Sequence, residues 1–111
     1  MARKPRRLAI RFTSKAERDL HLIWAWNVEV YGERHADLYI AFLRGRLEAV
    51  AGDPQTGFSI PEWPGMFRAS IRRRTKRHGH YAFYIVDNDG ILVVRILHTA
   101  QNWPNILGEE T

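Results

Sequence analysis

The chain has 111 residues, with 17 Lys and Arg against 12 Asp and Glu, so its formal net charge is +5. This length fits one domain with a two-layer core, and the basic balance favours anionic partners. The absence of cysteine excludes a disulfide framework, a thiolate nucleophile and a cysteine-based zinc site. The sequence contains neither the roughly 18 apolar residues of a membrane span nor a secretory signal after its basic start. We therefore expect a cytoplasmic protein with no membrane partner.

The N-terminal part predicts a basic arm, a short strand and a helix. Residues 1–7 are rich in Arg and Lys and predict a flexible arm. Apolar side chains recur at every second position of residues 8–13, which is the period of a half-buried strand. Ser14 and Glu17 fit a capping box, with Ser14 as the N-cap of a helix that covers residues 15–31.

A second helix follows with almost no linker. Apolar residues recur at helical spacing over residues 33–51, and Gly32 separates this helix from the first one. Two helices with so short a connection predict an antiparallel helix hairpin over residues 15–51. The proline- and glycine-rich stretch 53–65 then predicts a loop.

The last third of the chain predicts a three-stranded meander over residues 66–98. Its strands are expected at residues 66–74, 80–87 and 91–98. Residues 99–111 form a C-terminal tail. The sequence thus predicts a single α+β domain over 1–111, of order β-α-α-β-β-β, with the helix hairpin packed on a small antiparallel sheet.

A dense group of cations without an acidic neighbour lies between residues 67 and 80. Such fixed charge close to aromatic residues is typical of a surface that binds a phosphate-bearing partner. We predict a target-binding surface made of Arg72, Arg73, Arg74, Lys76, Arg77 and, from the last strand, Arg95. The alternative for each single cation is a solvated sheet edge, where it discourages strand-to-strand aggregation. Arg95 stands in an apolar run, so it must reach an edge, form an ion pair or line a cleft.

His98 ends the last predicted strand and is a candidate general acid or base, because an imidazole titrates near neutral pH. The alternative is a histidine that caps the strand or binds a loop carbonyl. His78 and His80 share a strand face, but no further ligand has suitable spacing, so we predict no metal site and no cofactor.

The helix hairpin carries more aromatic residues than one core face can hold. Trp24 and Trp26 point about 200° apart on a helix with 3.6 residues per turn, so one of them must meet a loop, the tail or another chain. Exposed aromatic rings often mark a protein interface. The residues predicted to bind a protein partner are Trp24, Trp26, Tyr39 and Phe42. The alternative is that the proline-rich loop covers one of the tryptophans.

Several motifs follow one another along nearly the whole chain. They are Phe12-Thr13-Ser14-Lys15-Ala16-Glu17-Arg18-Asp19-Leu20, Ile23, Tyr31-Gly32, Ala36, Tyr39, Leu43, Leu47, Asp53-Pro54, Gly57, Tyr81-Ala82-Phe83-Tyr84-Ile85-Val86 and Val94-Arg95-Ile96-Leu97-His98. In order and spacing they resemble the ParE branch of the ParE/RelE toxin superfamily, components of bacterial type II toxin-antitoxin systems. The ending Arg95-Ile96-Leu97-His98, followed by Gln101, is the sharpest part of the resemblance.

The resemblance implies a helix hairpin on a small antiparallel sheet, a role in plasmid stabilisation, and inhibition by a cognate antitoxin in a hetero-oligomer. The partner of the hairpin aromatic residues is then the antitoxin. Members of the superfamily act in two ways. ParE-like toxins poison DNA gyrase, whereas RelE-like toxins cleave mRNA in the ribosomal A site with basic residues and, often, a C-terminal Tyr or a His.

The gyrase-poison interpretation needs only a binding surface, and we prefer it because no tyrosine follows His98. The tail carries Trp103 instead, and an indole N–H does not transfer a proton at neutral pH. A ribosome-dependent mRNA endoribonuclease is the alternative, because residues 70–80 are more basic than we expect for a gyrase poison. For a ribonuclease, the predicted catalytic set is His98, Arg95, Arg72 and Arg74. A third interpretation is an inactive regulatory or structural partner.

Overall fold

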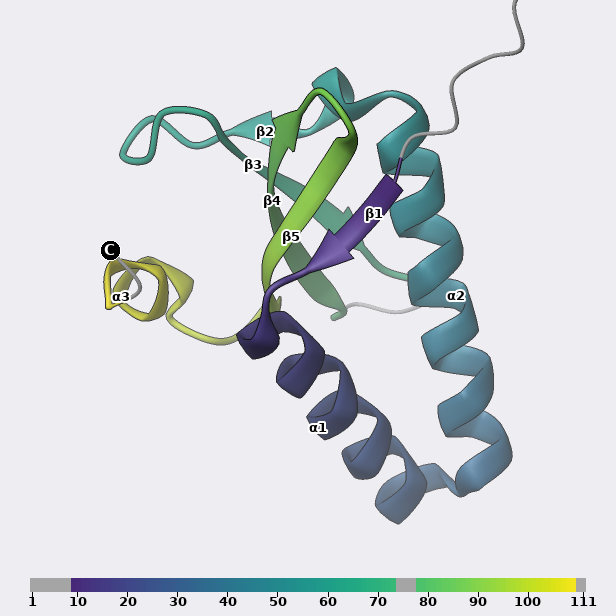
Figure 1. Ribbon diagram of the computed structural model, residues 1–111. Helices are drawn as coiled ribbons and strands as arrows, with labels where there is room; N and C mark the ends of the chain where they lie inside the picture. The colour runs from purple at the N-terminus through teal and green to yellow at the C-terminus, as the bar shows by residue number, and fades with distance from the viewer. Residues whose placement is uncertain (1–8, 74–77, 110–111) are drawn as a thin grey trace, which may run out of the picture.

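The computed structural model describes residues 9–73 and 78–109. Two long helices pack against a five-stranded, mostly antiparallel sheet (Figure 1), which confirms the predicted α+β class. The elements in chain order are β1 (Ala9–Phe12), α1 (Ser14–Tyr31), α2 (Glu33–Gly52), a short 3-10 turn η1 (Pro54–Thr56), β2 (Phe58–Ser59), β3 (Met66–Ile71), β4 (His80–Asp87), β5 (Gly90–His98) and α3 (Trp103–Gly108).

The sheet has the strand order β1-β5-β4-β3-β2. Strands β3, β4 and β5 form the predicted antiparallel meander, and β4 has the predicted bounds. Strand β3 ends at Ile71, so the prediction that this strand continues to residue 74 is wrong for Arg72 and Arg73. Position 74 itself and the predicted N-terminal arm lie outside the described residues.

Strand β1 differs from the predicted antiparallel arrangement, because it pairs with β5 in parallel from Ala9↔Gly90 to Phe12↔Val93. A parallel neighbour needs a long crossover connection, whereas an antiparallel one needs only a tight turn. The helix hairpin and three strands stand between β1 and β5 in the chain, which supplies that connection. A further strand, β2, pairs antiparallel with β3 inside the stretch predicted as a loop.

The predicted cap of the first helix is wrong by one residue. Thr13 is the N-cap, with extended backbone at φ −67° and ψ 161°, and its Oγ1 accepts a hydrogen bond from the Ala16 N–H at 3.1 Å. The same hydroxyl donates to the carbonyl oxygen of Val94 at 2.7 Å. Thr13 therefore caps α1 and joins the helix to β5, which Ser14 has no means of doing from inside the helix.

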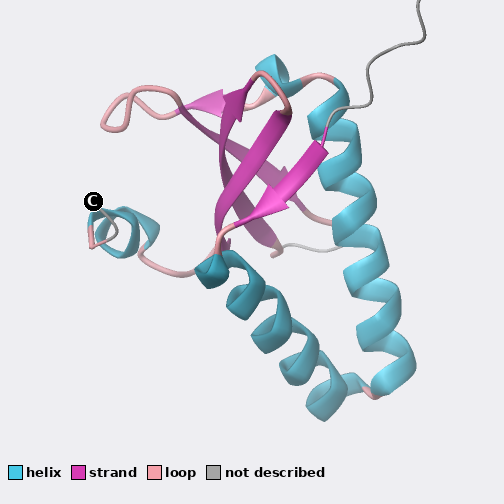
Figure 2. Ribbon diagram, viewed as in Figure 1, coloured by secondary structure: helices cyan, strands magenta, loops and turns pink. Residues whose placement is uncertain are grey.

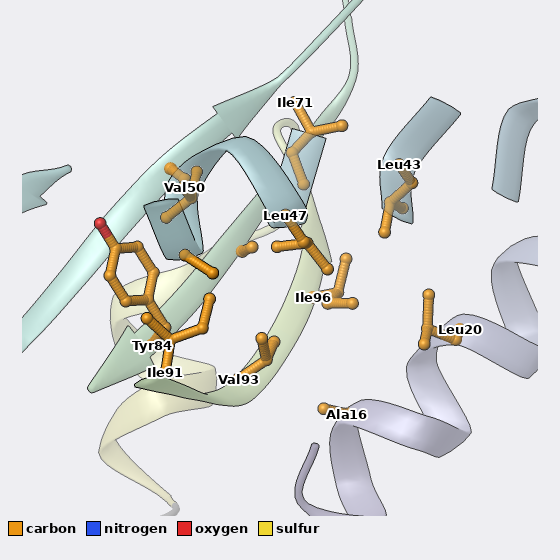
Figure 3. Close-up of a cluster of buried hydrophobic side chains, with 13 residues drawn as sticks. Ala16, Leu20, Leu43, Leu47, Val50, Ile71, Tyr84, Ile91, Val93 and Ile96 are labelled. Carbon is orange, nitrogen blue, oxygen red and sulfur yellow. The ribbon is translucent and has the colours of Figure 1, made fainter. Parts of the chain in front are cut away.

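The main core lies between the helix hairpin and the sheet. Leu20 of α1 and Leu47 of α2 point toward Ile96 and Tyr84 of the sheet (Figure 3). On the opposite face of the sheet (Figure 2), part of the predicted tail forms α3 and buries Leu107 against Phe83. Helices therefore cover both faces, and within the described chain none of them has the length and apolar character needed to cross a membrane.

Candidate functional site: a histidine-lined cleft

A cleft of about 710 Å³ opens where the helix hairpin meets the ends of β4 and β5. Two helices and two strands contribute to its wall, so its shape depends on the packing of the whole fold. Its lining includes Ile23 and Trp26 from α1, His35 and Tyr39 from α2, and His80 and His98 from the two strands.

His80 and His98 stand opposite each other on β4 and β5, with ring centroids 5.4 Å apart and ring planes at 90°. The Tyr39 hydroxyl lies 2.6 Å from Nδ1 of His80. The pKa of His80 is lowered from 6.5 to about 4, mainly because the imidazole is buried and also because of the nearby His98, while Asp19 opposes the shift. His80 is therefore neutral at neutral pH. Burial also raises the pKa of Tyr39, so the tyrosine hydroxyl keeps its proton. The direction of its hydrogen bond with Nδ1 of His80 follows the tautomer of the imidazole.

His98 caps the end of β5, which is one of the alternatives expected from the sequence, and it also lines the cleft. Its Nδ1 accepts a hydrogen bond from the Ala100 N–H at 3.0 Å, and its own backbone N–H donates to Oε1 of Gln101 at 2.7 Å. These bonds close the end of β5, as expected of a capping histidine. His78 lies beside His98, with ring centroids 5.9 Å apart, and both residues line the cleft.

Arg95 takes the second of its three predicted settings, because it forms an ion pair. Its Nε donates to Oδ2 of Asp19 at 2.8 Å and its Nη2 donates to Oδ1 at 3.0 Å. The side chains of Arg95 and Asp19 are only 17% and 10% exposed. Arg95 is not among the residues that line the cleft, so its guanidinium is engaged by α1 and not presented beside His98.

Among the other predicted target-binding residues, Arg72 and Arg73 follow directly after β3. Arg72 is exposed. Arg73 lines the cleft, and its guanidinium lies over the rings of Phe42 and Tyr39, 5.4 and 5.8 Å from their centroids. The remaining predicted cations, Arg74, Lys76 and Arg77, lie outside the described residues.

The predicted partner-binding aromatic residues divide between two sides of the hairpin, as the angle between the tryptophans requires. Trp26 lines the cleft together with Tyr39 and is 56% exposed. Trp24 lines a separate cavity of about 420 Å³, and its Nε1 donates to Oδ1 of Asp37 at 2.9 Å. Phe42 is half-buried and packs against the main core.

Sequence reasoning missed two residues that organise this region. Asp19 lies three positions after buried Ala16, on the apolar stripe of α1, and a carboxylate on such a stripe signals a buried partner. The role of His80 had a weaker signal, because its bond to Tyr39 joins residues 41 positions apart. Within residues 9–73 and 78–109, no group of three or more His, Asp or Glu side chains is arranged to hold a metal ion.

Comparisons with known proteins agree with this architecture. A family model described as "ParE toxin of type II toxin-antitoxin system, parDE" matches residues 10–103. A solved structure described as "Chromosomal ParDE TA system from P. aeruginosa" is similar with a TM-score of 0.67 and 21% sequence identity, covering 84% of this chain and 97% of that chain, and so shows the same fold. No curated protein matches the sequence. The family match spans most of the chain, and the chain therefore belongs to the ParE toxin family of type II toxin-antitoxin systems.

Proposed function

We propose that this ParE-family toxin acts by binding and poisoning DNA gyrase, and that a cognate antitoxin neutralises it by covering the cleft. The observation that carries the proposal is the engagement of Arg95 by Asp19. Phosphodiester cleavage requires an acid, a base and a cation at the same reacting phosphate. Since Arg95 lies in a buried ion pair away from the cleft, the set predicted for a ribonuclease lacks one of its cations there.

The target-binding surface in this proposal is the cationic segment after β3. Arg72 and Arg73 begin it, and the sequence continues it with Arg74, Lys76 and Arg77. A gyrase engaged with DNA offers anionic surfaces to which such a segment is attracted. The toxin then acts as a binding module, with no bond made or broken by its own side chains.

Neutralisation follows from the position of Arg73 at the wall of the cleft. Its guanidinium lies over Tyr39, which is one of the predicted antitoxin contacts. An antitoxin segment seated on Trp26 and Tyr39 covers Arg73 as well, so target and antitoxin compete for overlapping surface. The toxin-antitoxin complex is thus expected to be a hetero-oligomer in the cytoplasm.

The proposal is tested with purified toxin and gyrase in a plasmid supercoiling assay. Wild-type toxin should inhibit supercoiling, added antitoxin should restore it, and Arg73→Ala should weaken the inhibition. Arg44→Ala is the matched control, because Arg44 also lies over an aromatic ring, that of Phe12, but lines the other cavity. Undiminished supercoiling at saturating toxin rejects gyrase as the target.

A ribosome-dependent mRNA endoribonuclease is the second candidate function. The observation that favours it is the gathering of His98, His80 and Arg73 around one open cleft, where imidazoles can move protons and a guanidinium can neutralise a phosphate. Replacement of His98 by Ala then abolishes mRNA cleavage on translating ribosomes. If wild-type toxin leaves ribosome-bound mRNA intact, this candidate is rejected.

A further inference from the structure

Arg68 of β3 lies on the face of the sheet that is turned away from the helix hairpin. Its neighbour Ala69 is buried in the core beneath the hairpin, and side chains alternate along a strand, so Arg68 points to the side where α3 lies (Figure 2). There its guanidinium lies over three aromatic rings, 4.8 Å from the ring centroid of Phe58, 4.4 Å from that of Tyr81 and 5.6 Å from that of Trp103. Arg68 and these three rings are called the Arg68 cluster below.

The strand register holds the Arg68 cluster together. Phe58 of β2 stands directly opposite Arg68, and Tyr81 of β4 is its diagonal neighbour on the other side. Side chains in such positions on adjacent strands contact each other. Trp103, at the start of α3, completes the cluster, and its ring centroid lies 5.3 Å from that of the buried Phe83. The guanidinium is therefore held in place by three strands and a helix.

Arg68 has aromatic neighbours but no counter-charge. Within residues 9–73 and 78–109 its nitrogen atoms form neither an ion pair nor a hydrogen bond, and no buried polar side-chain atom there lacks a partner. The N–H groups of Arg68 therefore reach solvent. The guanidinium of Arg95, in contrast, is paired with Asp19. A guanidinium that is stacked on rings presents its donors in a fixed plane, which suits the oxygen atoms of a phosphate.

Phe58 adds an exposed ring beside these donors. Its side chain is 60% exposed, although large apolar side chains are usually covered in a folded protein. An exposed ring of this kind stacks with any nucleic-acid base, because every base has a π face. A polynucleotide offers a base and a phosphate at every step, which matches a ring and a guanidinium 4.8 Å apart. The net charge of +5 on the whole chain adds long-range attraction to such a ligand.

We propose that the Arg68 cluster binds single-stranded nucleic acid, with a base stacked on Phe58 and an adjoining phosphate accepting hydrogen bonds from Arg68. Tyr81 and Trp103 are positioning residues, because their rings hold the guanidinium. No residue of the Arg68 cluster lines the histidine-lined cleft, so this site is separate from the one proposed for the antitoxin. Neither contact reads the 2′-hydroxyl, and DNA and RNA strands should bind alike.

The test uses purified full-length toxin and a fluorescein-labelled oligothymidylate of about ten nucleotides, with the affinity measured by fluorescence anisotropy. The matched ligand is an abasic deoxyribose-phosphate chain of the same length, which keeps the phosphates and lacks the bases. The oligothymidylate should bind about tenfold or more tightly, as expected for the stacking of one base. An oligouridylate of equal length should bind as the oligothymidylate does. In NMR spectra, the oligothymidylate should shift the Nε–H resonance of Arg68.

Variants of Phe58 test the stacking contact. Phe58→Ala should weaken binding of the oligothymidylate about tenfold, whereas Phe58→Trp should retain it, because a ring remains for the base. Tyr31→Ala is the matched control, since Tyr31 is 58% exposed but lines the cleft. This control should bind the oligothymidylate as the wild type does.

Variants of Arg68 test the phosphate contact through the salt dependence of binding. Arg68→Gln should reduce the slope of log affinity against log salt concentration by about 0.7, the change expected for one phosphate contact to a single strand. Arg44→Gln removes the same charge beside a ring of the other cavity and should leave the slope unchanged. A purely structural role of Arg68 does not alter this slope.

Four outcomes overturn the inference. The oligothymidylate does not bind, or the abasic chain binds as tightly as it does. Alternatively, Tyr31→Ala weakens binding while Phe58→Ala does not, which moves the nucleic acid to the cleft. In the fourth outcome, a peptide of alternating Phe and Glu shifts the Arg68 resonance and the oligothymidylate does not, which assigns the cluster to an acidic protein. The assay contains neither gyrase nor antitoxin, so its result is independent of the proposed function.

Discussion

Arg95 and Asp19, 76 residues apart in the sequence, form a two-pronged ion pair that joins β5 to α1. The pair lies just beyond the point where β1 stops pairing with β5, at Phe12↔Val93. There Asp19 also accepts a hydrogen bond from the Ile96 N–H at 2.9 Å, so one carboxylate satisfies both a strand edge and a buried guanidinium. This arrangement makes Arg95 a structural residue of the fold.

Asp19→Asn should lower the free energy of unfolding by about 3–5 kcal/mol, because it removes the carboxylate that pairs with a nearly buried guanidinium. Urea unfolding monitored by tryptophan fluorescence measures the change. Arg11→Gln is the matched control, since it removes the exposed ion pair of Arg11 with Asp87; it should leave the unfolding midpoint unchanged. Similar midpoints for the two variants would show that the buried ion pair contributes no more to the free energy of unfolding than the exposed pair does.

The free energy of unfolding should depend on pH because His80 titrates differently in the folded and unfolded states. The pKa of this imidazole is about 4 in the folded protein and 6.5 in an exposed chain, so the unfolded state binds the extra proton first as the pH falls. His80 therefore makes the free energy of unfolding decrease below pH 6.5, by up to about 1.4 kcal/mol per pH unit, until the pH reaches about 4.

Unfolding curves at pH 7 and pH 5 measure this contribution as a difference between variants. His80→Asn retains a polar atom near Nδ1 but does not titrate, so its stability should fall less than that of the wild type between the two pH values. The control is His21→Gln, which removes an exposed histidine of α1. The free energy of unfolding of this variant should decrease between the two pH values as much as that of the wild type. Equal pH slopes for wild type and His80→Asn would contradict the low pKa.

Two glycines should respond to alanine in opposite directions. Gly90 has φ +144°, and an added Cβ would lie 2.0 Å from the carbonyl oxygen of Ala9, so Gly90→Ala must displace β1 from β5. It should destabilise the protein by about 1–3 kcal/mol. Gly45 lies in α2 with open space around it, so Gly45→Ala should stabilise by about 0.5–1 kcal/mol. Thermal unfolding distinguishes the two signs, and a stable Gly90→Ala would contradict the parallel register.

The elements that the sequence predicts well are those with strong local periodicity. The hairpin helices and β4 follow from apolar spacing, and the short link at Gly32 imposes their order. Features that depend on distant pairing were missed. The two residues of β2 are too few to show a period, and the direction of β1 depends on a partner about 80 positions away. Thr13 and Ser14 are both good N-caps, and only the contact of Thr13 with Val94 decides between them.

The candidate site was predictable as residue types but not as an assembly. The sequence pattern identified His98, Arg73, Trp26 and Tyr39 as candidates, and the structure brings all four to the same cleft. It also identified Arg95, whose charge is engaged by Asp19. Nothing local in the sequence shows that Arg73 lines the cleft whereas Arg95 pairs with a carboxylate. The ion pair of Arg95 forms only when α1 packs against β5.

Trp26 should contribute more to antitoxin affinity than Trp24. Trp26 stands exposed at the cleft, whereas Trp24 faces the other cavity and is held by Asp37. In binding measurements with the antitoxin from the neighbouring reading frame, Trp26→Ala should weaken affinity about thirtyfold, the loss typical of a central tryptophan. Trp24→Ala should weaken it much less. A larger loss for Trp24→Ala would move the antitoxin to the other side of the hairpin.

The central claim, that the toxin traps gyrase and does not cut RNA, is tested most directly by inducing it in cells without antitoxin and mapping DNA breaks and mRNA 3′ ends in the same cultures. Gyrase poisoning predicts DNA breaks that accumulate while ribosomal A-site codons remain uncut. Cleavage of mRNA at A-site codons with intact chromosomal DNA would contradict the account and favour the ribonuclease. Intact DNA together with intact mRNA would contradict it too, and would identify an inactive member of the family.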